Sequence, residues 1–271
     1  MSTLHKWVLG GKYLAKHEEN RMASEGAVAE ARQRFFQQRF RNLDYLLRSR
    51  YEWMNDYLKP DSVIIEIGAG AGFSELYLKY RPILTDAADH PWINRFIDAT
   101  QMDLADESVD VIIASHTVHH FYSPYKFFME CQRVLKKGGI VIIQEINTSF
   151  FMRLLLRMMR HEGWAYDVDV FNPDAIVNDA NDLWSANCAV PELLFHNPRT
   201  FERTFPKLQV TRNKCCEFLL FPLSGGVIAK TSIPELPGIV LRGVMVVDSI
   251  LTQIAPSIFA LGRQVVVQRS L

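Results

Sequence analysis

Three histidines stand close together near the middle of the chain: His116, His119 and His120. They follow the apolar segment Val109–Ser115, whose β-branched content predicts a buried strand. An imidazole changes protonation near neutral pH, so it can accept a proton from a hydroxyl group without a large pKa shift. The cluster therefore predicts acid–base chemistry, while helix capping or loop fixation is the structural alternative for all three.

A glycine-rich turn earlier in the chain predicts a ligand site. The β-branched run Val63–Ile65 predicts a strand buried on both faces of a sheet, and helical spacing resumes over Phe73–Leu78. Between them lie Gly68, Gly70 and Gly72. Glycine lets a backbone bend sharply and approach a ligand that a β-carbon would exclude. Strand, glycine turn and helix together are typical of a nucleotide-type site.

The spacing of the glycines disfavours a dinucleotide. That fingerprint needs glycines at the first, third and sixth positions, and the sixth position counted from Gly68 is Phe73. The acid Glu66 stands just before the turn, where it would repel a pyrophosphate but attract an ammonium group. The turn therefore predicts a cofactor that has an amino-acid end and no phosphates.

Further acids stand where later strands end. Asp86 closes the second predicted strand, 20 residues after Glu66, a distance at which a carboxylate can accept hydrogen bonds from ribose hydroxyls. Asp89 is close enough in sequence to compete for that role. Only 11 residues separate Asp86 from Asp98, too few for the usual helix and strand, so we expect the helix to be shortened or replaced by a loop containing Pro91.

Three motifs carry a resemblance to a known family. The Glu-x-Gly-x-Gly-x-Gly pattern at 66–72 resembles motif I of the class I S-adenosylmethionine-dependent methyltransferases. The pair Asp98-Ala99 resembles the segment that contacts adenine in that family, and Arg133–Gly139 is similar to the segment before its fifth strand. The resemblance covers roughly residues 60–147. It is specific for the cofactor and not for the acceptor.

The resemblance assigns roles to individual residues. S-adenosylmethionine is the implied cofactor, and S-adenosylhomocysteine is its product. The implied cofactor-binding residues are Glu66, Gly68, Gly70, Gly72, Asp86, Asp98, Ala99 and Ser115. His120 occupies the position at which several sugar-methylating relatives place a histidine, so it is our first candidate for the general base, before His116 and His119. Glu145 and Tyr122 are lesser candidates.

The resemblance also implies the fold: an α/β protein with a doubly wound, mostly parallel, seven-stranded Rossmann-like sheet, N-terminal helices and a helical insertion near the C-terminus. Ligands of such sheets sit beyond the carboxyl ends of the strands. We expect one structural domain in four parts. These are a helical cover (1–58), a cofactor-binding core (59–148), a lid or acceptor insertion (149–200) and the C-terminal part of the sheet with an apolar helical excursion (201–271).

Periodicity and end signals predict several further elements. They are a helix over Tyr125–Lys137 that ends at Gly138-Gly139, strands over Ile140–Glu145 and Val265–Val267, helices over Ser149–Arg160 and Asn197–Phe205, a strand from Leu208 that extends through Phe221, and an apolar helical hairpin near 238–260.

Composition limits the partners and the compartment. Thirty basic and thirty acidic residues cancel in a chain of 271, so no global field points to nucleic acid. The N-terminal Met1–Trp7 lacks the apolar core of a signal peptide, and the uncharged run between Asp248 and Arg263 is shorter than the ~20 residues that span a bilayer. Four cysteines without metal-ligand spacing predict no metal and a reduced, cytoplasmic protein. They are Cys131, Cys188, Cys215 and Cys216.

The predicted function is methylation of an oxygen atom on a small or carrier-linked acceptor, such as a sugar, a glycan or a secondary metabolite. The acceptor class rests on a faint resemblance of Pro222–Gly226 and the following apolar segment to methyltransferases of bacterial surface-glycan and secondary-metabolite pathways. Two alternatives stay open: a nicotinamide-dependent oxidoreductase, which Phe73 disfavours, and a protein that binds the cofactor without turnover. The apolar excursion leaves a homodimer face, a peripheral membrane contact and a substrate wall equally open.

Overall fold

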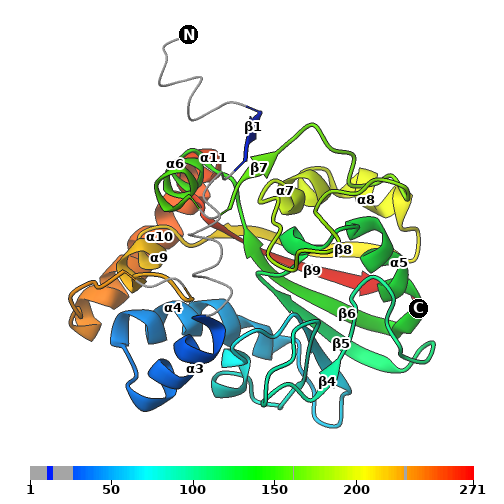
Figure 1. The fold of residues 1–271 in the computed structure, drawn as a ribbon, viewed down its shortest axis with the longest axis horizontal. Helices are drawn as coiled ribbons and strands as arrows, with labels where there is room; N and C mark the ends of the chain where they lie inside the picture. The colour runs from blue at the N-terminus through cyan, green and yellow to red at the C-terminus, as the bar shows by residue number, and fades with distance from the viewer. Residues whose placement is uncertain (1–10, 15–26, 161, 229–230) are drawn as a thin grey trace.

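A seven-stranded sheet crosses the molecule in the order β4-β3-β2-β5-β6-β9-β8 (Figure 1). The computed structural model describes residues 11–14, 27–160, 162–228 and 231–271, so Met1–Trp7 lies outside the described residues. The strands of the sheet are β2 (Ile64–Ile67), β3 (Ile83–Asp86), β4 (Arg95–Phe96), β5 (Val109–Ser115), β6 (Leu135–Ile146), β8 (Leu208–Cys216) and β9 (Gly262–Arg269). A separate antiparallel pair joins β1 (Lys12–Tyr13) to β7 (Trp164–Ala165).

The large sheet is parallel except for one strand. β3 and β5 flank β2 in parallel, and β4 and β6 extend the sheet outward in the same direction. β9 runs antiparallel between β6 and β8. This arrangement confirms the predicted doubly wound, mostly parallel, seven-stranded sheet. The strand order reverses between β2 and β5, which is where such sheets bind ligands.

Alternate residues of the central strands build two separate cores. Ile65 and Ile112 pack in one core with phenylalanines of the helices α5 (Pro124–Val134), α7 (Val190–Phe195) and α8 (Pro198–Thr204). Ile64 and Ile113 pack in the other core with the N-terminal helices α3 (Ala27–Gln37) and α4 (Arg41–Tyr51). Side chains of a strand alternate between its two faces, so a strand covered by helices on both sides is apolar throughout.

The segment after the glycine turn is shorter than predicted. In place of a helix over Phe73–Leu78, the chain forms a 3₁₀ helix over Phe73–Leu76. The side chain of Ser74 is fully buried, and its hydroxyl donates to the Glu66 carboxylate. The backbone N–H of Leu78 donates to the Ser74 carbonyl at 3.0 Å. The chain then turns directly into β3, which leaves no length for further helical turns. The expected loop between Asp86 and Asp98 is confirmed, and β4 within it is only two residues long.

Gly138 and Gly139 do not cap a helix, which corrects the prediction. α5 ends at Val134, Leu135 already has extended backbone, and β6 begins there. The ladder between β5 and β6 is interrupted over residues 136–139. Gly138 has a φ of +75°, and a β-carbon on Gly139 would lie 2.9 Å from a backbone oxygen. The two glycines therefore serve an irregularity within a strand.

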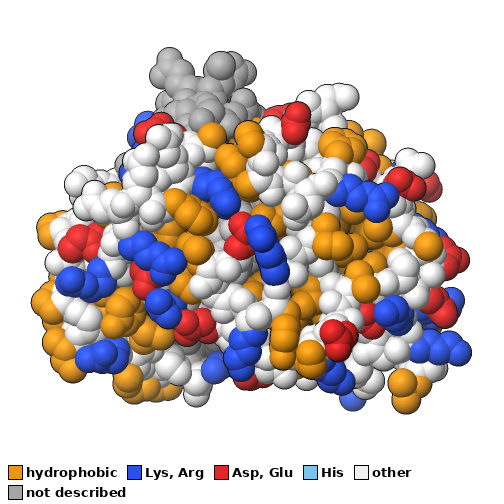
Figure 2. All heavy atoms as spheres, turned by 90° about the horizontal axis from the view of Figure 1, so that it is seen from below, with side chains coloured by type: hydrophobic (Ala, Val, Ile, Leu, Met, Phe, Trp, Pro, Cys, Tyr) orange, Lys and Arg blue, Asp and Glu red, His pale blue; other side chains and the backbone are white. Residues whose placement is uncertain are grey.

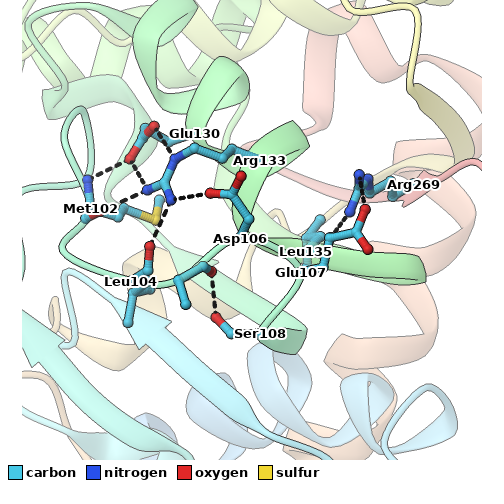
Figure 3. Close-up of polar contacts among 10 residues, drawn as sticks. Met102, Leu104, Asp106, Glu107, Ser108, Glu130, Arg133, Leu135 and Arg269 are labelled. Carbon is cyan, nitrogen blue, oxygen red and sulfur yellow. Dashed lines mark hydrogen bonds and ion pairs between the residues drawn. The ribbon is translucent and has the colours of Figure 1, made fainter.

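Arg133 of α5 ties the loop that follows β4 to the body of the fold (Figure 3). Its guanidinium donates to the carbonyls of Leu104 at 2.6 Å and Met102 at 2.8 Å, and it pairs with the carboxylates of Glu130 and Asp106 at 2.7 and 2.8 Å. One side chain thereby satisfies several polar groups of an otherwise irregular segment. The network holds the chain just beyond the predicted adenine-contacting pair.

The helices predicted over Ser149–Arg160 and Asn197–Phe205 are confirmed, and each is capped by the side chain of the residue before its first turn. α6 spans Phe150–Met159, and the Ser149 side chain accepts from the backbone N–H of Met152 at 3.3 Å. α8 begins after Asn197, whose side chain accepts from the N–H of Arg199 at 3.2 Å. Such caps satisfy the N–H groups that have no partner within a helix.

The strand β8 ends at Cys216, so its predicted extension through Phe221 is wrong. The chain turns at Glu217, which has a φ of +61°, and enters the short helix α9 (Leu220–Ser224). The buried carboxylate of Asp248 accepts three backbone N–H bonds, from residues 218, 219 and 220, at 2.8–3.1 Å. Asp248 belongs to α10 (Gly238–Ile254). The segment predicted as an apolar helical hairpin is this one long helix, followed by the four-residue helix α11 (Pro256–Phe259).

A buried ion pair joins the N-terminal helices to the end of β8. Arg50 of α4 donates to the carboxylate of Glu217 at 2.9 and 2.6 Å, and both side chains are less than a tenth exposed. We expect Glu217→Ala to lower the free energy of unfolding by about 3–5 kcal/mol, because it leaves the Arg50 charge buried without a partner. Urea denaturation measures the loss. The double variant Arg50→Met, Glu217→Leu should recover most of it, and a double variant as unstable as the single one would contradict this account.

Candidate functional site

A cavity of about 560 Å³ opens at the carboxyl ends of β2, β3 and β5. Its volume lies within the range of small-molecule sites, and its position is the one expected for a doubly wound sheet. Nine of the eleven predicted site residues line it: Gly68, Gly70, Asp86, Asp98, Ala99, Ser115, His116, His119 and His120. The two that do not are Glu66 and Gly72. The structure thus brings the predicted nucleoside end and the predicted histidines to one cavity.

The glycines of the turn have three different surroundings. A β-carbon on Gly68 would lie 2.1 Å from the Thr117 hydroxyl, so this position admits no side chain. A β-carbon on Gly70 would meet nothing within 4 Å, because this residue borders the open cavity. Gly72 faces away, toward the guanidinium of Arg32. All three have positive φ, which favours glycine.

Asp86 holds the glycine turn while it lines the cavity. Its two carboxylate oxygens accept from the backbone N–H groups of Gly70 and Ala88, both at 2.8 Å. The indole N–H of Trp92 donates to the Gly70 carbonyl at 2.8 Å from the following loop. Asp89, the competing candidate, is exposed and does not line the cavity. Of the two acids, the geometry therefore favours Asp86.

Asp98 and Ala99 line the cavity next to Asp86. One carboxylate oxygen of Asp98 accepts from the backbone N–H and the hydroxyl of Thr100, at 2.8 and 2.7 Å. The Thr100 hydroxyl also lies 2.9 Å from the hydroxyl of Tyr122, another cavity residue. These bonds fix the plane of the Asp98 carboxylate and link it to the segment that carries the histidines.

Glu66 lies beneath the cavity and not on its wall. The side chain is fully buried and accepts a short hydrogen bond from the hydroxyl of Ser74, with the Tyr51 hydroxyl also in reach. Burial raises the pKa of Glu66 to about 8, against the opposing effect of the Ser74 bond. In this structure the carboxyl group is engaged within the protein, where it fixes the start of the glycine turn.

The raised pKa of Glu66 predicts a pH effect on stability. An unfolded chain has a glutamate pKa of about 4.3, so the folded protein binds more protons than the unfolded one between that pH and about 8. Stability from this group is complete below pH 4.3 and is lost as the pH rises toward 8, by at most about 1.4 kcal/mol per pH unit. We expect the free energy of unfolding of Glu66→Gln, relative to that of the wild type, to rise steadily from pH 5 to 8 in urea denaturation. A constant difference would contradict the assignment.

His119 is held by a buried carboxylate. Its Nδ1 lies 2.7 Å from Glu145, which is fully buried and also accepts from the backbone N–H groups of Val118 at 2.6 Å and Ile146 at 2.8 Å. Burial opposes a charge on His119, but the Glu145 carboxylate outweighs it and raises the pKa of the imidazole. Glu145 thus positions His119 and does not itself face the cavity.

His120 is a neutral imidazole with a defined tautomer. Its Nδ1 lies 3.2 Å from the carbonyl of Ser185, which can only accept, so Nδ1 carries the proton and Nε2 keeps its lone pair. Burial, and then the neighbouring charge of His119, lower the pKa of His120 to about 4. His116 is also kept neutral by burial, and its Nε2 is buried without a hydrogen-bond partner in the described structure.

Several cavity residues were not predicted. Arg50 and Tyr51 reach the cavity from α4, and Asp182 and Trp184 reach it from the loop before α7. The N-terminal helices and the 149–200 segment do therefore border the site. No local motif marks these residues, because they come from segments far from the glycine turn in sequence.

The family comparison agrees with the geometry. Residues 65–143, from β2 to β6, match the model of a family described as a methyltransferase domain. This segment is a class I S-adenosylmethionine-dependent methyltransferase domain. Its cofactor is S-adenosylmethionine. The nine lining residues are consistent with that molecule, because the backbone at Gly70 borders open space and Asp86 and Asp98 place carboxylates near it. None of the nine is a lysine or an arginine that would bind a pyrophosphate.

Solved structures of other methyltransferases resemble the chain at low identity. One is an S-adenosylmethionine-dependent methyltransferase from Archaeoglobus fulgidus, 17% identical, covering 88% of this chain and 99% of that one with a TM-score of 0.48. Another, from Thermotoga maritima, is described as a possible histamine N-methyltransferase, 18% identical, covering 93% and 100% with a TM-score of 0.48. We draw nothing about the acceptor from them. No curated protein matched this methyltransferase.

Proposed function

We propose that this methyltransferase transfers a methyl group to a hydroxyl oxygen of a small or carrier-linked acceptor, such as a sugar, a glycan or a secondary metabolite. The observation that supports it is a neutral, half-buried histidine, His120, in the same cavity as the predicted cofactor-binding residues. A hydroxyl must lose its proton as it attacks, whereas a carboxylate is already ionised and needs no such base. The bound cofactor supplies the methyl group and the sulfonium leaving group.

The residues divide the cavity into two ends. We assign the ribose hydroxyls of the cofactor to Asp86, and its adenine edge to Asp98 and the backbone of Ala99. Gly68 and Gly70 let the backbone approach the cofactor closely. We assign the acceptor to the end lined by Ser115 and the histidines. Glu66 then acts by shaping the turn through Ser74, and Gly72 by letting the chain pass Arg32. The protein's main contribution is the alignment of acceptor, methyl group and sulfur.

Within the acceptor end, His120 is our general base. The carbonyl of Ser185 fixes its tautomer, so its Nε2 is the nitrogen that can take a proton. His119 is already bonded to Glu145. Its raised pKa leaves a smaller fraction of this imidazole unprotonated and able to accept a proton at neutral pH. His116 is the second candidate because its Nε2 has no partner in the described structure.

An acceptor screen tests this proposal. The enzyme is incubated with methyl-labelled S-adenosylmethionine and a panel of sugars, phenols, amines and carboxylates, and the products are analysed by mass spectrometry. We expect labelled methyl ethers and S-adenosylhomocysteine in equal amounts. Label on nitrogen or carbon would overturn the proposed acceptor atom. Cofactor binding without product from any acceptor class would support the alternative of a binding protein without turnover, and reduction of NAD by an alcohol would support an oxidoreductase.

We further propose that the outer face of α10 and α11 contacts a membrane surface that carries the acceptor. Seven side chains of this face are more than two-fifths exposed: Ile239, Val240, Val246, Val247, Ile250, Ile254 and Ile258. No acidic residue lies among them, and Asp248 of the same helix is turned inward. Among the described residues, no helix could cross a bilayer.

Vesicle co-sedimentation tests this face. We expect the wild type to pellet with vesicles and the variant Val246→Glu, Ile250→Glu to lose at least ten-fold in the partition constant, because charged side chains cannot enter the acyl boundary. Light scattering at the same concentrations measures the oligomeric state. A dimer that the same variant converts to a monomer, without vesicle binding by the wild type, would assign the face to a second copy.

The basic and acidic side chains are interspersed on the face shown in Figure 2, in line with the zero net charge. A surface of this kind attracts no polyanion. We therefore propose no nucleic-acid partner, and a cytoplasmic location in which the four cysteines form no disulfide.

A further inference from the structure

The cavity borders a cluster of side chains that the proposed methyl transfer does not use. His119 Nε2, a carboxylate oxygen of Glu162 and Cys188 Sγ all lie within 4.8 Å of one another. We propose that these three side chains bind one divalent transition-metal ion, and that zinc is the ion they suit best. The inference does not depend on the nature of the methyl acceptor.

The ligand types and distances suit zinc. Imidazole, thiolate and carboxylate are the three protein ligands of that ion, with bond lengths of about 2.0–2.3 Å, which places tetrahedral ligand atoms roughly 3.3–3.8 Å apart. Cys188 Sγ lies 3.3 Å from the Glu162 carboxylate, and His119 Nε2 lies 3.9 Å from it. Small side-chain movements would therefore complete the geometry. A thiolate ligand disfavours magnesium and calcium, which take oxygen ligands.

Glu145 supplies the outer support that zinc-binding histidines have. It lies 2.7 Å from His119 Nδ1, so Nδ1 donates to Glu145 and Nε2 points its lone pair toward Glu162 and Cys188. This carboxylate–histidine arrangement fixes the ring and raises its basicity toward a metal.

The backbone holds Glu162 and Cys188 side by side, although 25 residues separate them in sequence. The N–H of Cys188 donates to the carbonyl of Gly163 at 2.9 Å, and Gly163 forms a parallel bridge with Asn187. The side chain of Asn187 closes the pair with two bonds to the backbone of Ala165, at 2.8 and 2.9 Å. Glu162 and Cys188 lie outside the helices and strands, and this isolated bridge with its hydrogen bonds holds their two segments together. This also explains why no cysteine spacing revealed the cluster.

Metal binding would change the protonation of the cluster and leave one coordination position open. Metal binding would replace the thiol proton, which leaves to solvent, along with any proton on His119 Nε2. Three protein ligands leave a fourth position, and both His119 and Glu162 line the cavity. That position is then open to water or to a donor atom of a bound molecule.

Cobalt(II) substitution tests the site on the full-length protein. Co²⁺ is added to chelator-treated enzyme, and the absorption spectrum is recorded. We expect one equivalent to give a sulfur-to-cobalt charge-transfer band in the near ultraviolet and visible bands of tetrahedral intensity, both removed by one equivalent of Zn²⁺. Cys188→Ser should abolish the charge-transfer band and weaken Co²⁺ binding at least ten-fold. Cys131→Ser, which removes another fully buried thiol, is the matched control and should change neither.

Two outcomes would overturn the proposal: no charge-transfer band in the wild type, or an equal band in Cys188→Ser. Glu162→Gln provides a second variant that keeps the size of the side chain, and unchanged Co²⁺ affinity in it would also contradict the site. Calorimetry with S-adenosylhomocysteine on the same samples shows whether each variant keeps its cofactor site, so loss of metal binding is distinguished from loss of fold.

Discussion

Gly70→Ala should reduce the affinity for S-adenosylhomocysteine at least 100-fold while the protein stays folded. A β-carbon at this position meets no atom of the protein within 4 Å, so the fold can accept it at the cost of the positive φ of 49°, about 1–2 kcal/mol. The same methyl group projects where the cavity borders the turn, into space that we assign to the cofactor. Calorimetry measures the affinity, and thermal unfolding measures the stability.

Two other glycines provide matched controls for this prediction. Gly68→Ala should unfold or distort the turn, because its β-carbon would lie 2.1 Å from the hydroxyl of Thr117. Gly243→Ala, on the exposed side of α10, should leave cofactor binding unchanged and stabilise the helix by about 0.5–1 kcal/mol. Wild-type affinity in a folded Gly70→Ala variant would show that the cofactor does not approach this turn.

His120→Gln should lower kcat by about 10²- to 10⁴-fold with little change in S-adenosylhomocysteine affinity. The amide of glutamine can still donate to the Ser185 carbonyl, as His120 Nδ1 does, but it cannot accept a proton from the acceptor. If His120 only holds the loop, this variant should retain most of the activity, and that result would contradict the assignment. His196→Gln, at an exposed position outside the cavity, should match the wild type.

The same histidine fixes the expected pH dependence. With a pKa of about 4, His120 is in its base form throughout the neutral range, and it loses that form only as the pH falls toward 4. We expect kcat to be level between pH 6 and 9 with an acceptor that does not ionise there, and to fall below about pH 5. A steep rise centred near pH 6.5 would instead indicate a histidine with an ordinary pKa.

Most strands were predictable because local signals agree with the tertiary fold. Val111–Ala114 is apolar throughout, with alternate residues in the two cores, so its composition alone marks a buried strand. The acids and glycines fall at the ends of such strands, and topology then brings them to one cavity. Asp86 was predicted in this way, whereas Asp98 was predicted from the family resemblance.

The errors came from positions where tertiary contacts outweigh local signals. Gly138 and Gly139 look like a helix end, but the β5–β6 register places them in an irregular strand. The extension of β8 toward Phe221 reads as a strand by composition, yet the carboxylate of Asp248 starts a helix there from 28 residues away. Local patterns also do not predict the direction of the Glu66 side chain. Its hydrogen-bond donor, the Ser74 hydroxyl, comes within reach only after the turn has folded.

The cluster of His119, Glu162 and Cys188 was invisible for a similar reason. Its members come from three separate segments, which only the fold assembles. Sequence spacing detects metal sites when the ligands share one hairpin or one helix. The expectation of no metal therefore rested on spacing alone, and the proposed zinc site departs from it.

The central claim is that the strand ends around Gly70, Asp86 and Asp98 bind one S-adenosylmethionine. The most direct test is calorimetric titration of the wild-type protein with S-adenosylhomocysteine and, separately, with NAD. We predict that S-adenosylhomocysteine binds with a stoichiometry of one and that NAD gives no heat of binding. Binding of NAD without binding of S-adenosylhomocysteine would contradict the account.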